Sequence, residues 1–295
     1  MAISEDFQAH MQSGLTTVAR CWQIVRGDGG TLGFTDHDCD LTFADTVFRA
    51  GSGLTALSLE QSTGLSVDNT EAMGALSDAA ISEMDIEAGR FDGAKVTAWM
   101  VNWADVAERM VVFRGSIGDI VRAGGAFQVE LRGLTEPLNQ PMGRVYQKPC
   151  GAILGDGACG FDVLQDGFFA EVAVQDVEDR RVFRFEGLTD YAPGWFARGR
   201  LDVLSGNAEG LSVSIKSDQF YGQTRVIELW APLRAEIAAG DALRLVAGCD
   251  KRFETCRAKF SNQVNFQGFP DIPGDSWIAT VPRQDGVNSG GSLRS

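Results

Sequence analysis

The sequence predicts a mainly β protein, and three observations support this fold class. The 295-residue chain contains 35 Gly but only 8 Pro, which favours many tight turns because glycine adopts positive φ at little cost. Short segments rich in β-branched and aromatic residues recur at even spacing, as they do in sandwiches and barrels. The 44% hydrophobic and 22% charged residues are typical of folded domains, and the length suggests about two of them.

The N-terminal half begins with one short helix and continues with strands. We expect the helix over residues 6–14, with Ser4 as its N-cap and Gly14 as its end. The first strand, over residues 16–25, ends at the turn formed by residues 27–30. A helical turn is expected over residues 78–83. The other predicted strands cover residues 31–34, 41–43, 47–49, 95–101, 110–115, 119–122 and 127–132.

An irregular stretch over residues 136–149 contains three prolines and indicates a domain boundary. We therefore expect one β domain over residues 1–140 and a second over residues 141–285. The last ten residues, 286–295, are rich in Gly and Ser and are expected to be mobile unless a partner orders them. Strands in the second domain are predicted over residues 168–174, 181–185, 211–216, 224–230 and 242–246.

The formal net charge of −14 argues against sequence-specific nucleic-acid binding, because an acidic surface repels phosphate. The sequence has no apolar run of about 18 residues, so no membrane-spanning helix is expected. The first ten residues are polar and acidic, unlike a signal peptide. We therefore expect synthesis in the cytoplasm, where thiols stay reduced. In that compartment six cysteines indicate metal binding or catalysis before disulfides.

Four cysteines form two pairs that can share one site. Eight residues separate Cys150 from Cys159, six separate Cys249 from Cys256, and a strand-rich segment lies between the pairs. A small barrel or meander brings its two ends together, which would place all four sulfurs around one centre. Glycines beside the cysteines expose backbone N–H groups that can donate to sulfur. Nearby cations would offset thiolate charge: Lys148, Lys251, Arg252 and Arg257.

The spacing alone does not identify the metal. Structural zinc sites usually take each ligand pair from a knuckle with two to four intervening residues, whereas iron–sulfur ligands tolerate wider spacing. Two unrelated pairs of buried cysteines remain an alternative, since free cysteine is a common core residue. A cysteine peptidase is disfavoured, because nothing near Cys21, Cys39 and His37 resembles a protease signature. The acidic stretch over residues 36–40 is interpreted as a polar turn, with an inter-subunit contact of His37 as a hypothesis.

Longer motifs carry a family resemblance. Residues 248–260 (GCDKRFETCRAKF) and 265–270 (NFQGFP) resemble the C-terminal signature of a phage tail-tip family. That family includes the minor tail protein L of lambda-like siphophages and the baseplate hub of alphaproteobacterial gene transfer agents. Residues 21–24 (CWQI) and 33–38 (GFTDHD) resemble the opening motif of the gene-transfer-agent branch. Residues 146–150 and 157–160 resemble the family's first cysteine pair.

The resemblance implies a structural protein and not an enzyme. It implies a homotrimeric hub at the distal tip of a phage-like tail, with a tail-tube-like β domain followed by a small β domain. The hub would join the distal tail protein ring to a larger, megatron-like tip or fibre protein and line the channel for DNA ejection, within a virion or virus-like particle. It also implies a [4Fe–4S] cluster, with Cys150, Cys159, Cys249 and Cys256 as its ligands.

Two further points follow from this implied cluster. Radical enzymes leave one iron free with three cysteines, so a four-cysteine set favours a closed, structural cluster. Phe266, Phe269 and Pro270 are expected to pack over it and shield it from solvent. The competing interpretations are a cytoplasmic iron–sulfur redox module and a zinc-stapled binding module.

Overall fold

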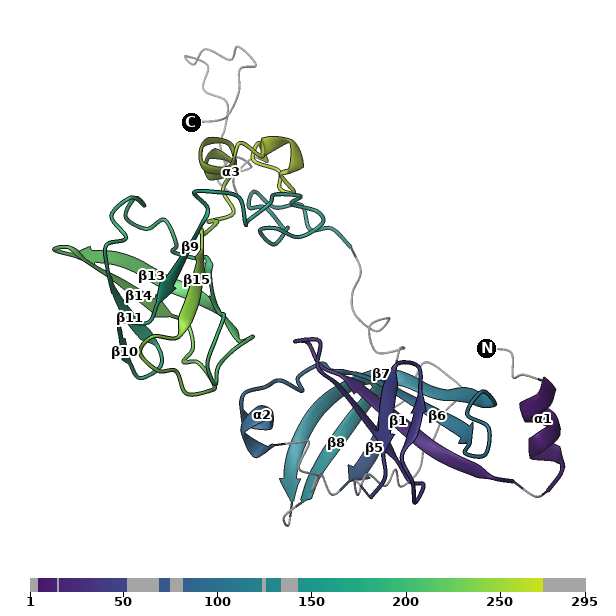
Figure 1. The fold of residues 1–295 in the computed structure, drawn as a ribbon. Helices are drawn as coiled ribbons and strands as arrows, with labels where there is room; N and C mark the ends of the chain where they lie inside the picture. The colour runs from purple at the N-terminus through teal and green to yellow at the C-terminus, as the bar shows by residue number, and fades with distance from the viewer. Residues whose placement is uncertain are drawn as a thin grey trace. The chain divides into compact units, whose positions relative to one another are not determined.

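The computed structural model describes residues 5–14, 16–51, 69–74, 82–123, 126–133 and 143–272. The chain divides into two compact units, Met1–Met142 and Gly143–Ser295. Strands dominate both units, so the prediction of a mainly β protein is confirmed (Figure 1). The expected domain boundary between residues 140 and 141, and the expected tail over residues 286–295, lie outside the described residues.

The N-terminal unit contains one sheet, whose described strands follow the order β3-β4-β2-β1-β6-β7-β8-β5. Neighbouring strands are antiparallel, except that β2 and β4 pair in parallel. The elements are α1 (Glu5–Gln12), β1 (Val18–Val25), β2 (Thr31–Thr35), β3 (Leu41–Phe43), β4 (Thr46–Arg49), β5 (Asn69–Gly74), α2 (Glu83–Glu87), β6 (Lys95–Asn102), β7 (Arg109–Ala123) and β8 (Ala126–Gly133).

Strand β1 lies inside this sheet and buries side chains on both faces. Trp22 and Ile24 belong to one core cluster, whereas Cys21 belongs to a second cluster with Phe48 and Val101. Successive side chains of a strand point to opposite faces, which explains the division. Cys21 is therefore a core residue of the N-terminal unit.

Strand β7 is longer than the sequence predicts. It runs continuously over Arg109–Ala123, where two strands over residues 110–115 and 119–122 were expected. Its register with β8 shifts between Ile117 and Ile120, because β7 contains one more residue than β8 at this point. A Cβ at Gly118 would lie 2.4 Å from Arg132 Nε, so a larger residue would displace that side chain. The break in the apolar pattern is a bulge and not a turn.

The short helices agree with their predicted positions in part. Helix α1 buries Phe7 completely. Ser82 is the N-cap of helix α2, and its Oγ accepts a hydrogen bond from the Asp85 N–H at 3.1 Å. Residues 78–81 of the expected helical turn lie outside the described residues.

The C-terminal unit contains an antiparallel sheet with strand order β10-β11-β14-β13-β12-β15-β9. Its strands are β9 (Phe169–Ala173), β10 (Asp176–Glu178), β11 (Val182–Glu186), β12 (Arg200–Val203), β13 (Ser212–Tyr221), β14 (Thr224–Leu229) and β15 (Ala242–Val246). Helix α3 (Phe253–Phe260) and the 3-10 helix η2 (Gln263–Asn265) follow the sheet. The sequence patterns do not predict β10, β12 or α3, since each is short and lies among turn residues.

A charged residue lies in the core of this unit. Arg225 of β14 is fully buried, with its guanidinium 4.8 Å from the ring centroid of Phe196 and 4.7 Å from that of Phe220. It donates two hydrogen bonds to the Asp218 carboxylate and one each to the carbonyl oxygens of Leu188, Tyr191 and Ala192. All five N–H groups of the guanidinium are therefore used, and they hold the loop before β12 against the sheet.

Within the described residues, none of the helices has the length and apolar character needed to cross a membrane.

Candidate metal centre

The first cysteine pair lies in a loop that a carboxylate organises. Asp156 accepts hydrogen bonds from the backbone N–H groups of Ile153 at 2.8 Å, Ala158 at 3.0 Å and Cys159 at 2.7 Å. These bonds, first that from Cys159, lower the pKa of the Asp156 carboxyl below its usual value. Gly155 turns the chain with φ of +85°. The loop that carries Cys150 and Cys159 is thus ordered by its own polar groups.

The second pair lies in the connection after β15 and in α3. Cys249 lies in the connection, and Cys256 lies in the middle of α3, where it is buried. Asp250 accepts hydrogen bonds from the Arg252 N–H at 3.0 Å and from the Thr255 hydroxyl at 2.9 Å. A carboxylate therefore fixes the start of α3, which places Cys256 relative to Cys249.

Hydrogen bonds join the two segments that carry the cysteine pairs, although 89 residues separate the pairs in sequence. The Cys150 N–H donates to the Lys251 carbonyl at 2.8 Å, and the Lys251 ammonium donates to the Ala152 carbonyl. The Gly151 N–H donates to the Gln267 carbonyl at 3.2 Å. In Figure 1 the segment that follows residue 143 runs beside α3.

All four cysteines line one cavity. The cavity is small, with a volume of about 20 Å³. The other lining residues are Ala152, Leu154, Lys251, Arg252, Phe260, Asn262, Asn265 and Phe266. The structure therefore brings together the four residues that the sequence analysis selected, among apolar side chains and two cations.

Hydrogen-bond donors reach the sulfur atoms of Cys150 and Cys159. The Gln267 backbone nitrogen lies 3.4 Å from Cys150 Sγ, and Asn262 Nδ2 lies 3.5 Å from Cys159 Sγ. The backbone N–H of Lys251 favours the thiolate of Cys249, although burial opposes it more strongly. Such donors stabilise thiolate over thiol, and they are a regular feature of metal-bound cysteines.

Burial opposes ionisation of the thiols when no cation is bound. Desolvation raises the pKa of Cys249, and it raises the pKa of Cys256 to about 11, with repulsion from the other three cysteines adding to the effect. Cysteines that bind a metal must be deprotonated. A bound cation would offset the negative charge of the four thiolates and so favour their ionisation. Four thiol donors of this kind fit either an iron–sulfur cluster or zinc.

The four cysteines share a cavity, but their side chains are not arranged around one point as the ligands of a single metal ion would be. In the part of the chain that the structure describes, no group of three or more His, Cys, Asp or Glu side chains is arranged to hold a metal ion.

Aromatic side chains pack beside the cavity, partly as expected. Phe266 lines it and contacts Phe253, with ring centroids 5.2 Å apart. Phe269 instead packs against Tyr146, at 4.6 Å. The sequence analysis missed a cluster of rings behind the cavity, in which Phe260 packs against Phe161 and Phe168 and Phe168 against Trp195.

A half-buried lysine connects this region to the sheet. The Lys259 ammonium donates to the carbonyl oxygens of Trp195 at 2.7 Å and Gly248 at 2.9 Å, and it lies 4.1 Å from the Trp195 ring centroid. Desolvation lowers the pKa of Lys259 to about 8. Loop, helix and sheet thus form one packed body around the cysteines.

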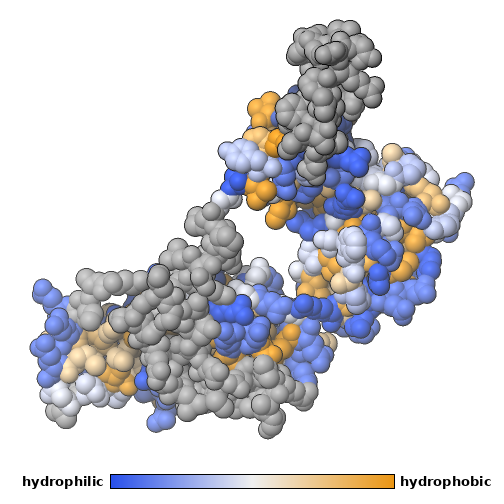
Figure 2. Space-filling model, turned by 180° about the vertical axis from the view of Figure 1, so that it is seen from behind, coloured by the Kyte–Doolittle hydropathy of each residue, from blue (hydrophilic) through white to orange (hydrophobic). Residues whose placement is uncertain are grey.

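Exposed apolar side chains surround the cysteine loops. Val145, Tyr146, Ile153 and Val264 are between 71% and 89% exposed. Figure 2 shows hydrophobic and hydrophilic residues side by side on the visible face of the molecule. Exposed apolar groups gathered in one region are common where one subunit contacts another.

The other cysteines lie in the N-terminal unit and do not belong to the cavity. Burial raises the pKa of Cys21 to about 11, and Cys39 is exposed. His37 Nδ1 accepts a hydrogen bond from the Cys39 N–H at 3.0 Å, and the His37 ring lies 5.1 Å from that of Trp103. The Asp36 carboxylate accepts from the Arg20 N–H at 2.6 Å. These local bonds agree with the interpretation of residues 36–40 as a polar turn.

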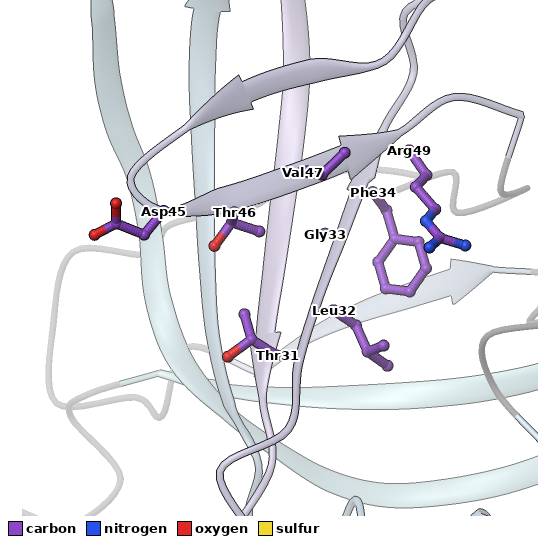
Figure 3. Close-up of a pocket in the computed structure, with 8 residues that line it drawn as sticks. All are labelled: Thr31, Leu32, Gly33, Phe34, Asp45, Thr46, Val47 and Arg49. Atoms are coloured by element: carbon purple, nitrogen blue, oxygen red, sulfur yellow. The ribbon is translucent and has the colours of Figure 1, made fainter.

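A second cavity, of about 450 Å³, lies beside β2 and β4 in the N-terminal unit (Figure 3). Its lining residues are Thr31, Leu32, Gly33, Phe34, Asp45, Thr46, Val47 and Arg49. A Cβ at Gly33 would lie 2.5 Å from the Val47 carbonyl oxygen, so glycine allows the two strands to approach here. None of the predicted site residues lines this cavity.

Comparison with known proteins identifies the family. Residues 4–162 match the family described as "Baseplate hub protein, N-terminal attachment domain", and residues 194–276 match "Phage conserved hypothetical protein BR0599". A chain in the structure "Virion of native gene transfer agent (GTA) particle" is 52% identical, with a TM-score of 0.89 over 98% of this chain and 100% of that chain. Among curated proteins, none matches. The baseplate hub model covers more than half of the sequence, and the resemblance seen in the motifs is confirmed: this chain belongs to the family of phage-like baseplate hub proteins.

Proposed function

We propose that the protein is the structural hub subunit at the distal tip of a phage-like tail, in a gene transfer agent or a siphophage. The observation that carries this proposal is the match of residues 4–162 to the baseplate hub attachment domain. The end-to-end similarity to a chain of a gene transfer agent particle supports it, because the same two units are present in both chains. The chain would be made in the bacterial cytoplasm and then assembled into the particle.

In this role the hub is a homotrimer that joins the distal tail protein ring to a larger, megatron-like tip or fibre protein. The exposed apolar side chains around the cysteine loops favour assembly with other subunits. The net charge of −14 suits a subunit that lines the DNA channel, because acidic walls do not hold the phosphate backbone.

Cys150, Cys159, Cys249 and Cys256 would hold a [4Fe–4S] cluster in the C-terminal unit. When bound, the cluster supplies four strong bonds between two loops, so its binding free energy becomes folding free energy of that unit. The wide ligand spacing favours a cluster over zinc. This is a structural use of iron, and it requires no catalytic residue.

Deleting the gene from a producing strain tests the hub role. We expect particles whose tails lack the tip and which deliver no DNA, with delivery restored by the intact gene. A gold label on a C-terminal tag should lie at the distal end of the tail, and cross-linking of whole particles should give a trimer. Normal tips in the deletion strain, or a label along the tube, would contradict the proposal.

Metal analysis of anaerobically purified protein tests the cluster. We expect about four iron and four sulfide per chain, with broad visible absorbance. Zinc without sulfide would identify a zinc-stapled module, and reversible redox cycling would favour an electron carrier. No metal in anaerobic material would remove the cluster and leave the hub assignment intact.

A further inference from the structure

Asn262 occupies a distinctive position at the end of helix α3. The helix ends at Ser261, which adopts a left-handed conformation with φ of +50°. This turn directs the chain back toward the cavity, and the Asn262 N–H donates to the carbonyl of Cys256 at 3.1 Å. Asn262 is therefore fixed to the helix that carries the last cysteine, and it lines the cavity.

The side chain of Asn262 contacts the first cysteine pair. Its Nδ2 donates to the Cys159 carbonyl at 2.7 Å and lies 3.5 Å from Cys159 Sγ. Its Oδ1 accepts a hydrogen bond from Asn265 Nδ2 at 2.7 Å. A carbonyl oxygen can only accept, so the amide nitrogen must face Cys159 and the oxygen must face Asn265.

We propose that Asn262 is a positioning residue that joins the two cysteine pairs into one site and donates a hydrogen bond to the sulfur of Cys159. The inference deepens the proposed cluster function. Only the role of the hydrogen bond to the Cys159 sulfur rests on the cluster, and the joining of the two pairs does not. Asn262 reaches Cys256 through its backbone and Cys159 through its side chain, so one residue sets the distance between the pairs. An aspartate here would have no side-chain N–H, and its charge would repel both the Cys159 carbonyl and the Cys159 sulfur.

The donor also has an electronic consequence. A hydrogen bond to a ligating sulfur stabilises negative charge on it, and so it favours the reduced state of a bound cluster. Removal of the donor should therefore shift the reduction potential to a more negative value, whereas a residue with only a packing role would leave the potential unchanged.

The test compares three variants of the full chain. Asn262→Asp removes the side-chain donor and adds a charge, and Asn262→Ala removes the side-chain donor with no charge. Gln263→Glu is the matched control, because it makes the same amide-to-carboxylate change on the exposed neighbour, which does not line the cavity. Asn262→Ala decides the outcome if Asn262→Asp fails to fold by circular dichroism.

The first measurement uses reduced, metal-free protein and needs no cluster. Hydrogen exchange of the backbone N–H groups in the first cysteine loop, residues 150–160, is followed by mass spectrometry, with peptides from the N-terminal unit as the internal reference. We expect exchange in this loop to be about tenfold faster in both Asn262 variants, the factor expected for one lost hydrogen bond of ordinary strength. Equal rates in Asn262→Ala and the unmodified protein would overturn the positioning role.

The second measurement uses anaerobic protein that contains iron. We expect less iron and sulfide per chain and a more negative reduction potential in Asn262→Ala, with Gln263→Glu unchanged. An unchanged potential would overturn the proposed bond to sulfur. If the unmodified protein contains no iron, the cluster proposal fails, whereas the hydrogen-exchange rates still decide the positioning role of Asn262.

Discussion

Replacement of Arg225 by methionine should destabilise the C-terminal unit strongly. Methionine keeps much of the length of the side chain, so the change removes charge and donors more than volume. The Asp218 side chain would then remain fully buried, with the Phe196 N–H at 2.9 Å as its remaining donor within the described residues. The carbonyl oxygens that Arg225 serves on Leu188, Tyr191 and Ala192 would also lose a donor.

The magnitude follows from these losses. Removing one partner of a buried ion pair typically costs about 3–5 kcal/mol. The donors lost by the Leu188 and Tyr191 carbonyls add to this cost, whereas the Ala192 carbonyl keeps the Trp195 N–H as a donor. Water entering the loop reduces the cost, so we expect about 3–5 kcal/mol in total. With a typical urea dependence of ~2 kcal/mol per molar, the unfolding midpoint should fall by about 1.5–2.5 M.

Hydrogen exchange across a urea series, with peptides from β11, β13 and β14 resolved by mass spectrometry, measures this change in the full chain. Peptides from the N-terminal unit provide an internal reference. Arg184→Met is the control, because Arg184 makes ion pairs with Asp176 and Glu178 at an exposed site, and such pairs contribute little. A midpoint shift below about 0.5 M, or one equal to that of the control, would refute the reasoning.

Three further predictions concern the cysteines and the carboxylate that orders them. Cys249→Ser should remove most of the iron and sulfide from anaerobically purified protein, whereas Cys39→Ser should retain both; equal metal content in the two variants would contradict the ligand assignment. In native reduced protein at pH 9, Cys39 should be alkylated within minutes and Cys21 should not, because burial raises the Cys21 pKa to about 11 and excludes the reagent; rapid labelling of Cys21 would show that β1 opens. Because the Asp156 pKa is lowered in the folded protein, its contribution to stability is complete above about pH 4 and is lost as the pH falls through the folded value. The Asp156→Asn variant should therefore show a weaker loss of stability in acid, and equal acid titrations of both proteins, measured by fluorescence, would sink this assignment.

Local patterns in the sequence were sufficient for the fold class and the family. Strand positions such as residues 95–101 and 242–246 follow from alternating side chains, because a strand is specified by its own residues and by which face they present. The motifs around Cys249 and Cys256 carry the family resemblance in contiguous residues, and the comparisons confirmed the family. The identity of the cofactor stays a prediction.

Contacts between distant residues were decided by the tertiary structure alone. The burial of Arg225 depends on carbonyls 33 to 37 residues away, and no local pattern indicates them. Whether β7 breaks or continues depends on its pairing with β8, since a bulge and a turn leave similar traces in one strand. The sequence selected the four cysteines, but the approach of Cys150 to Lys251 and of Asn262 to Cys159 arises only when the sheet brings both ends of a long segment together.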